Sequence, residues 1–397
     1  MKNLLVGQSG GPTAAINATL AGVIAAGIKS EGIATVYGCV NGIEGALKDN
    51  LMNLSDFFAD ADKIEILKQT PSAFLGSCRY KVSEKDIPSI VEKLVKNNIG
   101  YFCYIGGNDS MDTVLKLKKP CAELGIKVIG VPKTIDNDLV GTDHCPGFGS
   151  AAKYIATTVS EIGRDASCYD LECVTIVEIM GRNAGWLAAS SALARFGGEA
   201  PDLIYLPEVT FDEEKFLSDV KAKVDEKKSI VVAVSEGIKN ADGSYVAEQK
   251  RAGNDDKFGH SQLGGAGKFL ELLIKERFGI KARSIELNTP QRCASHIASK
   301  VDIEESSLIG SKAVEAALSG ESGKMMCYKR TQGSEYAIEI SAMDIEKIAN
   351  AEKKVPNEYI AENGCDVTKA FIDYAYPLIQ GERNTIYNNG LPVHVSR

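Results

Sequence analysis

The sequence predicts an α/β protein with two doubly wound, mostly parallel sheets. Short apolar runs typical of buried strands alternate with helical patterns along both halves of the chain. Loops rich in glycine and charged residues follow several of these strands. Because ligands of parallel sheets bind beyond the carboxyl ends of the strands, we expect a site there, in a cleft between two Rossmann-like domains.

The first half of the chain begins with a short strand, a glycine turn and a helix whose apolar face runs from Ile16 to Ile28. A second helix is expected to start at Ser83, with Asp86 three residues later in the manner of a capping box. The strands expected in this half are Leu4–Val6, Tyr101–Ile105 and Lys127–Val131.

The second half repeats this alternation. Strands are expected at Val174–Ile179, Leu203–Leu206 and Ile230–Val234. Helices are expected from Asn183, around Phe211–Val224 and over Leu263–Phe278, with a polar loop at Lys239–Gln262. The tail from about Gly323 shows two short strand-like runs and two helices.

Composition excludes several classes of protein. The net charge of −8 disfavours a general nucleic-acid binder, and no apolar stretch is long enough for a membrane helix. The N-terminus lacks the layout of a signal peptide, and the 10 cysteines are scattered without a CxxC pair. We therefore expect reduced thiols in a cytoplasmic protein without membrane or nucleic-acid partners.

Two strand-end loops have the composition of phosphate sites. Gly10-Gly11-Pro12-Thr13 opens a helix, and glycine lets backbone N–H groups approach an anion, although such turns are also common as plain architecture. Gly106-Gly107-Asn108-Asp109-Ser110 adds an acid and an amide, which suit a phosphate and metal site. Asp109 or Ser110 could instead cap the following helix.

Two further loops carry charged side chains that architecture explains less well. Lys133-Thr134-Ile135-Asp136-Asn137-Asp138 places two carboxylates beside an ammonium and a hydroxyl. One carboxylate can take a proton from a hydroxyl nucleophile while the other holds Mg²⁺. In Met180-Gly181-Arg182-Asn183 an arginine at a helix start could neutralise a phosphoryl group in transfer, or could simply be a surface arginine.

Together these loops resemble the phosphofructokinase family. The most specific match is TIDND at Thr134–Asp138, followed by Gly141-Thr142-Asp143. Further matches in the family's order are FLGSCR at Phe74–Arg79, Ser235-Glu236-Gly237, Arg283 and Gln291-Arg292. The resemblance runs from Gly7 to about Lys300.

The resemblance implies Mg²⁺-dependent phosphoryl transfer to the 1-hydroxyl of fructose 6-phosphate, a step of glycolysis and gluconeogenesis, by a homodimer or homotetramer. Asp136 would be the base, with Thr134, Arg182, Lys133 and Asp109 also at the reaction centre. The residues implied for the donor are Gly11, Arg79, Gly107, Asp109, Ser110 and Lys133; for the sugar, Thr134, Ile135, Asp136, Met180, Gly181, Arg182, Glu236, Arg283, Thr289, Gln291 and Arg292; and for the metal, Asn108 and Asp138. Arg283, Arg292 or both would come from a neighbouring subunit.

The implied donor domain comprises residues 1–147 and about 291–343. The implied sugar-phosphate domain comprises residues 148–290 and about 344–397, including a C-terminal extension.

Two positions favour pyrophosphate over ATP as the donor. Members that use ATP have glycine where this chain has Asp109 and Lys133, so both residues are similar to the pyrophosphate-dependent branch. A carboxylate at Asp109 would repel the α-phosphate of ATP, by about 4 kcal/mol gross at ~4 Å and an effective dielectric of ~20. That branch usually has two acids here, whereas this chain has Asn108 in the first of the two positions, and a neutral amide is a weaker Mg²⁺ ligand than a carboxylate.

Three alternatives remain at the level of sequence. An ATP-dependent 6-phosphofructokinase stays open because Asn108 makes the metal site atypical of the pyrophosphate-dependent branch. A sugar-phosphate sensor would be expected to lack the base Asp136. A dinucleotide-dependent oxidoreductase would need a complete GxGxxG, whereas Gly7-Gln8-Ser9-Gly10-Gly11 does not supply one.

Overall fold

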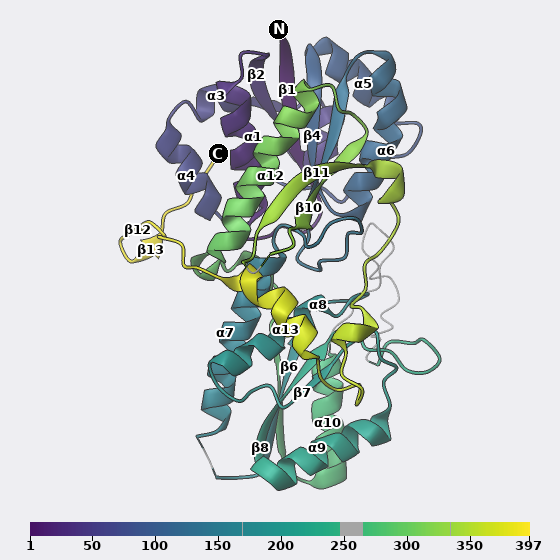
Figure 1. Cartoon of the computed structure of the whole chain (residues 1–397), viewed down its shortest axis with the longest axis vertical. Helices are drawn as coiled ribbons and strands as arrows, with labels where there is room; N and C mark the ends of the chain where they lie inside the picture. The colour runs from purple at the N-terminus through teal and green to yellow at the C-terminus, as the bar shows by residue number, and fades with distance from the viewer. Residues whose placement is uncertain (169, 247–264, 334) are drawn as a thin grey trace. The chain divides into compact units, whose positions relative to one another are not determined.

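The structure is a computed structural model that describes residues 1–168, 170–246, 265–333 and 335–397 (Figure 1). It divides into two compact units, which we describe separately. The first unit comprises Met1–Ser150, Arg292–Glu352 and Gly381–Arg397, and the second comprises Ala151–Gln291 and Lys353–Gln380.

The C-terminal tail differs from our expectation, which assigned all of 344–397 to the second domain. Residues 344–352 and 381–397 belong to the first unit, where Gln69, Thr70 and Leu75 are among the residues that hydrogen-bond to the tail. Gln69 Nε2 donates to the carbonyls of Ile386 and Val393, at 3.1 and 2.6 Å. The tail contains a small hairpin of β12 (Tyr387–Asn388) and β13 (Leu391–Pro392).

The first unit contains a sheet of seven strands in the order β11-β10-β5-β4-β1-β2-β3. Its inner pairs are parallel, and only the edge strands β3 and β11 are antiparallel to their neighbours, which confirms the predicted mostly parallel sheet. The strands are β1 (Lys2–Gln8), β2 (Ile33–Cys39), β3 (Leu51–Asn53), β4 (Ile99–Gly106), β5 (Lys127–Pro132), β10 (Lys324–Arg330) and β11 (Ile338–Asp344).

Helices cover both faces of this sheet, as a doubly wound fold requires. Leu4 and Val6 of β1 belong to a core that includes Ile309 of α12, whereas Leu5 belongs to the opposite core with Ile90 of α5. This alternation follows from the period of two residues in a strand. The helices are α1 (Ile16–Lys29), α2 (Gly42–Leu47), α3 (Leu54–Phe57), α4 (Ala61–Gln69), α5 (Ile87–Lys96), α6 (Asn108–Glu123) and α12 (Lys300–Leu318), with α1 and α12 side by side in Figure 1.

Helix α5 begins at Ile87, so the predicted start at Ser83 is wrong. Asp86 does accept hydrogen bonds from the backbone N–H and the hydroxyl of Ser83, both at 2.8 Å, but within the turn before the helix. A helix from Ser83 would put Pro88 in its interior, where proline lacks the N–H that Glu84 would need. Proline is tolerated only in the first turn, and the helix starts accordingly.

The second unit contains a fully parallel sheet of four strands in the order β7-β8-β6-β9. The three strands predicted here are confirmed to within about one residue. The strands are β6 (Cys173–Ile179), β7 (Leu203–Tyr205), β8 (Ser229–Ser235) and β9 (Lys281–Glu286). The helices are α7 (Phe148–Ala166), α8 (Trp186–Ser190), α9 (Glu213–Lys227), α10 (Ala266–Phe278) and α13 (Lys369–Ala375), while the short α11 (Pro290–Cys293) lies where the chain passes between the units.

Helix α8 begins at Trp186, so the predicted start at Asn183 is wrong. The Gly185 N–H donates to Glu208 Oε1 at 2.9 Å, and the chain before it follows an extended loop with Gly181 at φ 140°. A long-range contact therefore sets this boundary. Of the predicted loop Lys239–Gln262, residues 247–262 lie outside the described part of the chain.

Among the described residues, no helix is both long enough and apolar enough to cross a bilayer.

Candidate active site

The glycine turn after β1 is held by two other predicted site loops. Gly10 adopts a φ of 75°, and its carbonyl accepts a hydrogen bond from the Ser77 hydroxyl at 2.6 Å. Its N–H donates to the Cys78 carbonyl at 3.4 Å. The Gly11 carbonyl accepts from Lys133 Nζ at 2.7 Å. The turn thus connects the loop that contains Arg79 with the end of β5.

Lys133 is a buried lysine of the first unit that lies near several other charged side chains. Its side chain is 3% exposed, and burial lowers its pKa to about 8. The carboxylates of Asp136 and Asp138 oppose this shift, while Arg292 and Arg79 add to it. The structure therefore gathers five charged residues that the sequence analysis singled out, three of them cations suited to an anionic ligand.

The loop after Lys133 folds back on itself. The Thr134 N–H donates to the Pro146 carbonyl at 3.2 Å, and Asn137 Oδ1 accepts from the Cys145 N–H at 2.9 Å. The Thr134 hydroxyl accepts the N–H of Asp136 at 3.1 Å, so its own proton is available for donation to another group. The neighbouring Ile135 is buried. Asp136 is therefore carried on a backbone anchored on both sides.

Asn108 and Asp138 lie together, as predicted for a metal pair. Asn108 Nδ2 donates to Asp138 Oδ2 at 3.4 Å, while Asn108 Oδ1 is buried without a hydrogen-bond partner. An orphaned carboxamide oxygen beside a carboxylate fits Mg²⁺, which takes one or two protein oxygens and completes its shell with substrate phosphates and water. No cluster of three or more His, Cys, Asp or Glu suited to a metal occurs in the described part of the chain.

The start of α6 decides between two interpretations of Asp109 and Ser110. The residue that precedes the helix is Gly107, and no side chain caps the helix there. Capping therefore does not explain these residues. Asp109 is exposed in the first turn, and Ser110 is buried with its N–H donating to the Gly107 carbonyl at 3.0 Å.

In the second unit, the loop after β6 is clamped from two sides. The Gly181 N–H donates to Glu236 Oε1 at 3.3 Å, and its carbonyl accepts from the Ser235 hydroxyl at 2.6 Å. The Met180 N–H donates to Gln291 Oε1 at 3.1 Å. Burial raises the pKa of Glu236. The structure thus brings together Met180, Gly181, Glu236 and Gln291 as expected.

Close backbone contact explains the glycine in Ser235-Glu236-Gly237. A Cβ on Gly237 would lie 2.1 Å from the Arg182 carbonyl oxygen, which no side chain could accommodate. The Arg182 backbone is therefore packed directly against the end of β8.

Arg283 is not brought to this loop within one chain. It lies on β9 opposite Thr175 of β6 and forms an ion pair with Asp165 at 3.7 Å. β6 continues for four residues beyond Thr175, to Ile179, before this loop begins, which corresponds to about 13 Å along a strand. Thr289 follows β9 in the sequence. Arg292 lies in the first unit. Its Nη1 atom is 3.3 Å from the position that a Cβ on Gly11 would occupy, so Arg292 lies beside the predicted donor residues.

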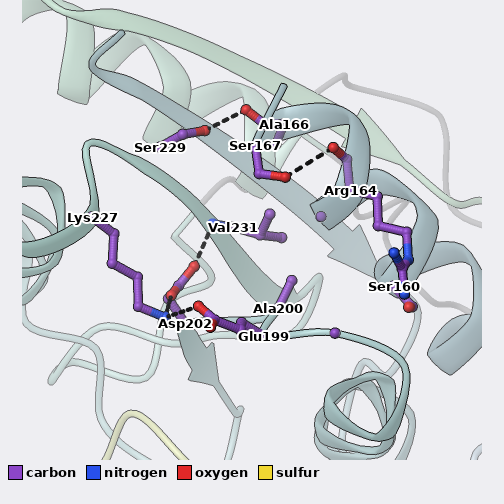
Figure 2. Close-up of a pocket in the computed structure, with 12 residues that line it drawn as sticks. Ser160, Arg164, Ala166, Ser167, Glu199, Ala200, Asp202, Lys227, Ser229 and Val231 are labelled. Atoms are coloured by element: carbon purple, nitrogen blue, oxygen red, sulfur yellow. Dashed lines mark hydrogen bonds and ion pairs between the residues drawn. The ribbon is translucent and has the colours of Figure 1, made fainter. Parts of the chain in front are cut away.

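A hollow of about 250 Å³ in the second unit lies apart from these loops (Figure 2). Lys227 Nζ there pairs with Asp202 and Glu199 at 3.0 and 3.1 Å. The hollow is formed around Ser229, where β8 begins, and therefore at the amino ends of the strands. None of the predicted site residues lines it, and ligands of parallel sheets bind at the opposite ends.

Sequence reasoning missed two residues that support the site. Glu208 accepts from the backbone N–H groups of Gly185 and Val355, both at 2.9 Å, and so fixes the end of the loop after β6. His144 lies just beyond Gly141-Thr142-Asp143 and is buried between two carboxylates. Its position next to a matched motif was the only signal in the sequence.

Cations, carboxylates and glycine turns lie at the strand ends of both α/β units, and these groups are typical of enzymes that transfer phosphoryl groups. Residues 3–316 match the family model described as Phosphofructokinase. The chain belongs to the phosphofructokinase family, and the resemblance inferred from its motifs is confirmed.

Relatives match over almost their full length. A protein of Methylococcus capsulatus named pyrophosphate–fructose 6-phosphate 1-phosphotransferase is 42% identical over 406 residues, which cover 100% of this chain and 96% of that protein. A protein of the same name from Xanthomonas campestris is 43% identical, with 99% and 96% covered. The crystal structure of a pyrophosphate-dependent phosphofructokinase from Nitrosospira multiformis superimposes with a TM-score of 0.89 at 39% identity, with 99% of this chain and 96% of that chain covered.

Proposed function

We propose that this protein catalyses reversible, Mg²⁺-dependent phosphoryl transfer between pyrophosphate and the 1-hydroxyl of fructose 6-phosphate. The products are fructose 1,6-bisphosphate and phosphate. The observation that carries the choice of donor is Lys133, a buried ammonium held at the glycine turn next to Arg79 and Arg292. Relatives of the same length carry the corresponding name.

Lys133 and Asp109 together favour a small inorganic donor. The Lys133 ammonium neutralises a phosphate leaving group that has no nucleoside to anchor it. Asp109 keeps a negative side chain at the start of α6, where members that use ATP have glycine. Because Asp109 is exposed, water screens its charge, and steric exclusion contributes alongside repulsion.

In the proposed reaction, Asp136 accepts the proton of the sugar 1-hydroxyl as that oxygen attacks the nearer phosphorus of pyrophosphate. The new O–P bond forms as the bridging P–O bond breaks, and the electron pair leaves with phosphate. The Thr134 hydroxyl and the Arg182 guanidinium stabilise charge on the phosphoryl group in transfer. Gly11 backbone groups, Arg79, Gly107 and Ser110 hold the donor.

Asn108 and Asp138 would hold Mg²⁺, which supplies charge neutralisation on the pyrophosphate oxygens when bound. The buried, unpartnered Asn108 Oδ1 supports this assignment.

The sugar is bound by the clamped loop of the second unit in this proposal, through Met180, Gly181, Arg182, Glu236, Thr289 and Gln291. Arg283 lies on β9 about 13 Å along the sheet from the end of β6, where the loop begins, and in this proposal it binds the 6-phosphate in a neighbouring subunit. The active species is therefore a homodimer or homotetramer. A cytoplasmic location is supported by the ten cysteines, all of them described and none of them joined in a disulfide.

A donor swap tests the function. The purified protein is assayed with fructose 6-phosphate and Mg²⁺, with pyrophosphate, ATP or neither, and bisphosphate formation is coupled to aldolase. We expect turnover with pyrophosphate at least tenfold above that with ATP. Rapid phosphorylation from ATP with none from pyrophosphate would instead identify an ATP-dependent 6-phosphofructokinase.

A further inference from the structure

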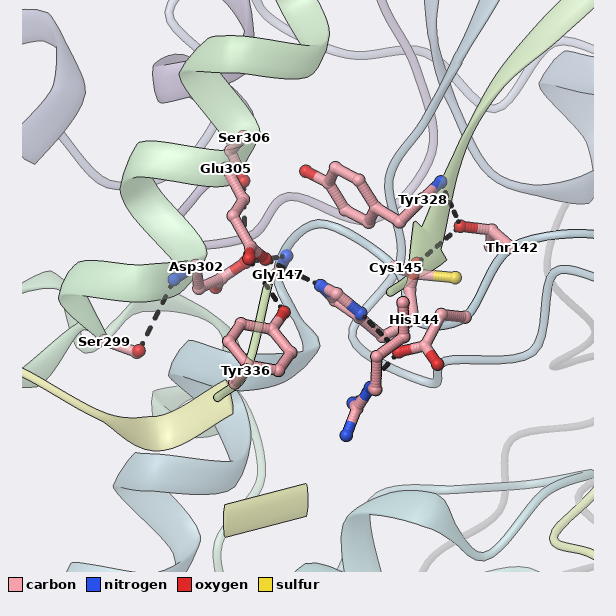
Figure 3. Close-up of polar contacts among 12 residues, drawn as sticks. Thr142, His144, Cys145, Gly147, Ser299, Asp302, Glu305, Ser306, Tyr328 and Tyr336 are labelled. Carbon is pink, nitrogen blue, oxygen red and sulfur yellow. Dashed lines mark hydrogen bonds and ion pairs between the residues drawn. The ribbon is translucent and has the colours of Figure 1, made fainter. Parts of the chain in front are cut away.

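The imidazole of His144 is held between two carboxylates in the first unit (Figure 3). Nδ1 lies 2.9 Å from Asp143 Oδ1, and Nε2 lies 2.8 Å from Glu305 Oε2. A neutral imidazole has only one N–H, whereas ionised carboxylates only accept hydrogen bonds. Both contacts are satisfied together when His144 is an imidazolium.

Groups from every neighbouring element face this ring. Tyr328 of β10 stacks on it with the ring centres 4.6 Å apart, and Asp302 of α12 is a further buried carboxylate. The carboxylates that flank the ring are themselves engaged: Arg330 Nη2 donates to Asp143 Oδ1 at 3.0 Å, and Tyr336 Oη donates to Glu305 Oε1 at 2.7 Å.

Asp143 therefore pairs with two cations, His144 and Arg330, whereas Glu305 pairs with His144. Burial opposes the charge on His144, but the hydrogen bonds to Asp143 and Glu305 outweigh it and raise the pKa of the imidazole. Loss of the proton would remove the ion pair of Glu305 with His144 and leave Asp143 with Arg330 alone, which costs free energy in a buried site. The ion pair of protonated His144 with Glu305 thus ties the loop that contains His144 to helix α12.

The backbone beyond His144 is fastened to the same helix. Asp302 of α12 accepts from the N–H of Gly147 through Oδ1 and from the N–H of Ser150 through Oδ2, both at 2.9 Å. The Ser150 hydroxyl also donates to Asp302, at 2.5 Å. Residues 144–150 are therefore tied to α12 by both Glu305 and Asp302.

These anchored residues in turn hold the segment that carries Asp136. The Pro146 carbonyl accepts the Thr134 N–H, and the Cys145 N–H donates to Asn137 Oδ1. Thr134 and Asn137 flank Asp136 on its two sides. A displacement of 144–147 would therefore move the backbone of Asp136 with it.

Building on the function proposed above, we propose that His144 is a positioning residue that ties the loop 133–147, with Asp136 and Asp138, to helix α12. It touches none of the proposed reacting groups. A base displaced by about 1 Å can lose two orders of magnitude in rate while substrates still bind. Loss of His144 should therefore lower kcat far more than it changes KM.

The kinetic test compares His144→Gln with the control His394→Gln, the same substitution at an exposed histidine in the tail. Glutamine keeps a donor for one carboxylate but carries no charge. We expect kcat to fall at least tenfold in His144→Gln, with KM for fructose 6-phosphate within about threefold, and both to stay unchanged in His394→Gln. An unchanged kcat per folded molecule in His144→Gln would overturn the proposal.

Glu305→Gln provides a second test in case His144→Gln fails to fold. Removing one flanking carboxylate lowers the pKa of His144, so the pH at which kcat falls on the alkaline side should move down. If Glu305→Gln and wild type lose kcat at the same alkaline pH, the proposal is overturned, because a purely structural role for His144 would not change the dependence of kcat on pH.

Hydrogen exchange separates this proposal from the function on which it rests, since it requires no substrate. Amides of 133–147 should exchange faster in His144→Gln or Glu305→Gln than in wild type, and no faster in His394→Gln. Faster exchange in a protein that shows no turnover would contradict the proposed function alone. Unchanged exchange at 133–147 would overturn the positioning role.

Discussion

Replacing Lys133 by methionine tests the choice of donor most directly. Methionine has a similar length without the charge, and Lys133 is 3% exposed with its ammonium 2.7 Å from the Gly11 carbonyl. If the ammonium neutralises pyrophosphate, Lys133→Met should lower kcat/KM for pyrophosphate. KM for fructose 6-phosphate should change little.

The Lys133 pKa of about 8 determines how strongly kcat/KM for pyrophosphate should depend on pH. Roughly ten in eleven Lys133 side chains are protonated one unit below this pKa and roughly one in eleven one unit above it. If only the ammonium form is productive, kcat/KM for pyrophosphate falls about tenfold between about pH 7 and about pH 9 because of Lys133. Pyrophosphate also titrates in this pH range. The pH dependence of kcat/KM that is still seen in Lys133→Met therefore measures the contribution of pyrophosphate.

The same shift carries a prediction for stability. Because burial lowers the folded-state pKa from 10.5 to about 8, the unfolded state binds more protons between these values. The contribution of Lys133 to the free energy of unfolding therefore rises with pH across that window, by on the order of 3 kcal/mol. Denaturant titrations of wild type should show this rise, and Lys133→Met should lack it.

The assay measures initial rates at varied pyrophosphate from about pH 6.5 to about pH 9.5, with aldolase coupling and circular dichroism to confirm folding. The reasoning about Lys133 is refuted if Lys133→Met retains the wild-type rate at neutral pH. It is also refuted if the two proteins show the same alkaline decline.

Three further predictions follow from single contacts. Asp136→Asn should lower kcat at least about 10²-fold with an unchanged melting temperature, and a near-normal kcat would exclude Asp136 as the base. Asp109→Gly should raise kcat/KM for ATP about tenfold, a modest gain because the carboxylate is exposed, and ATP use that stays undetectable would show that other groups exclude the nucleotide. Gln69→Ala removes the hydrogen bonds to Ile386 and Val393, so limited proteolysis should cut the tail faster, at a cost of about 1–3 kcal/mol in unfolding free energy; an unchanged cleavage rate would mean that other contacts hold the tail.

Local sequence determined the elements of this fold. The strands β1, β4, β5, β6, β7 and β8 were predicted from short apolar runs, which favour buried strands, whereas β2, β3 and β9 were not. The family was predictable from TIDND and the motifs around it, because a phosphoryl-transfer site needs carboxylates, cations and glycine turns at particular strand ends. These features depend on neighbours close in the chain.

Tertiary structure decided what depends on distant residues. The start of α8 follows from the contact between Gly185 and Glu208, and the tail is held in the first unit by hydrogen bonds with residues such as Gln69 and Thr70. The depressed pKa of Lys133 arises from burial, which no local pattern states. His144 and Glu305 are 161 positions apart in the sequence, so only the tertiary structure places this carboxylate beside the imidazole. The contact favours the protonated form of His144 and ties its loop to α12.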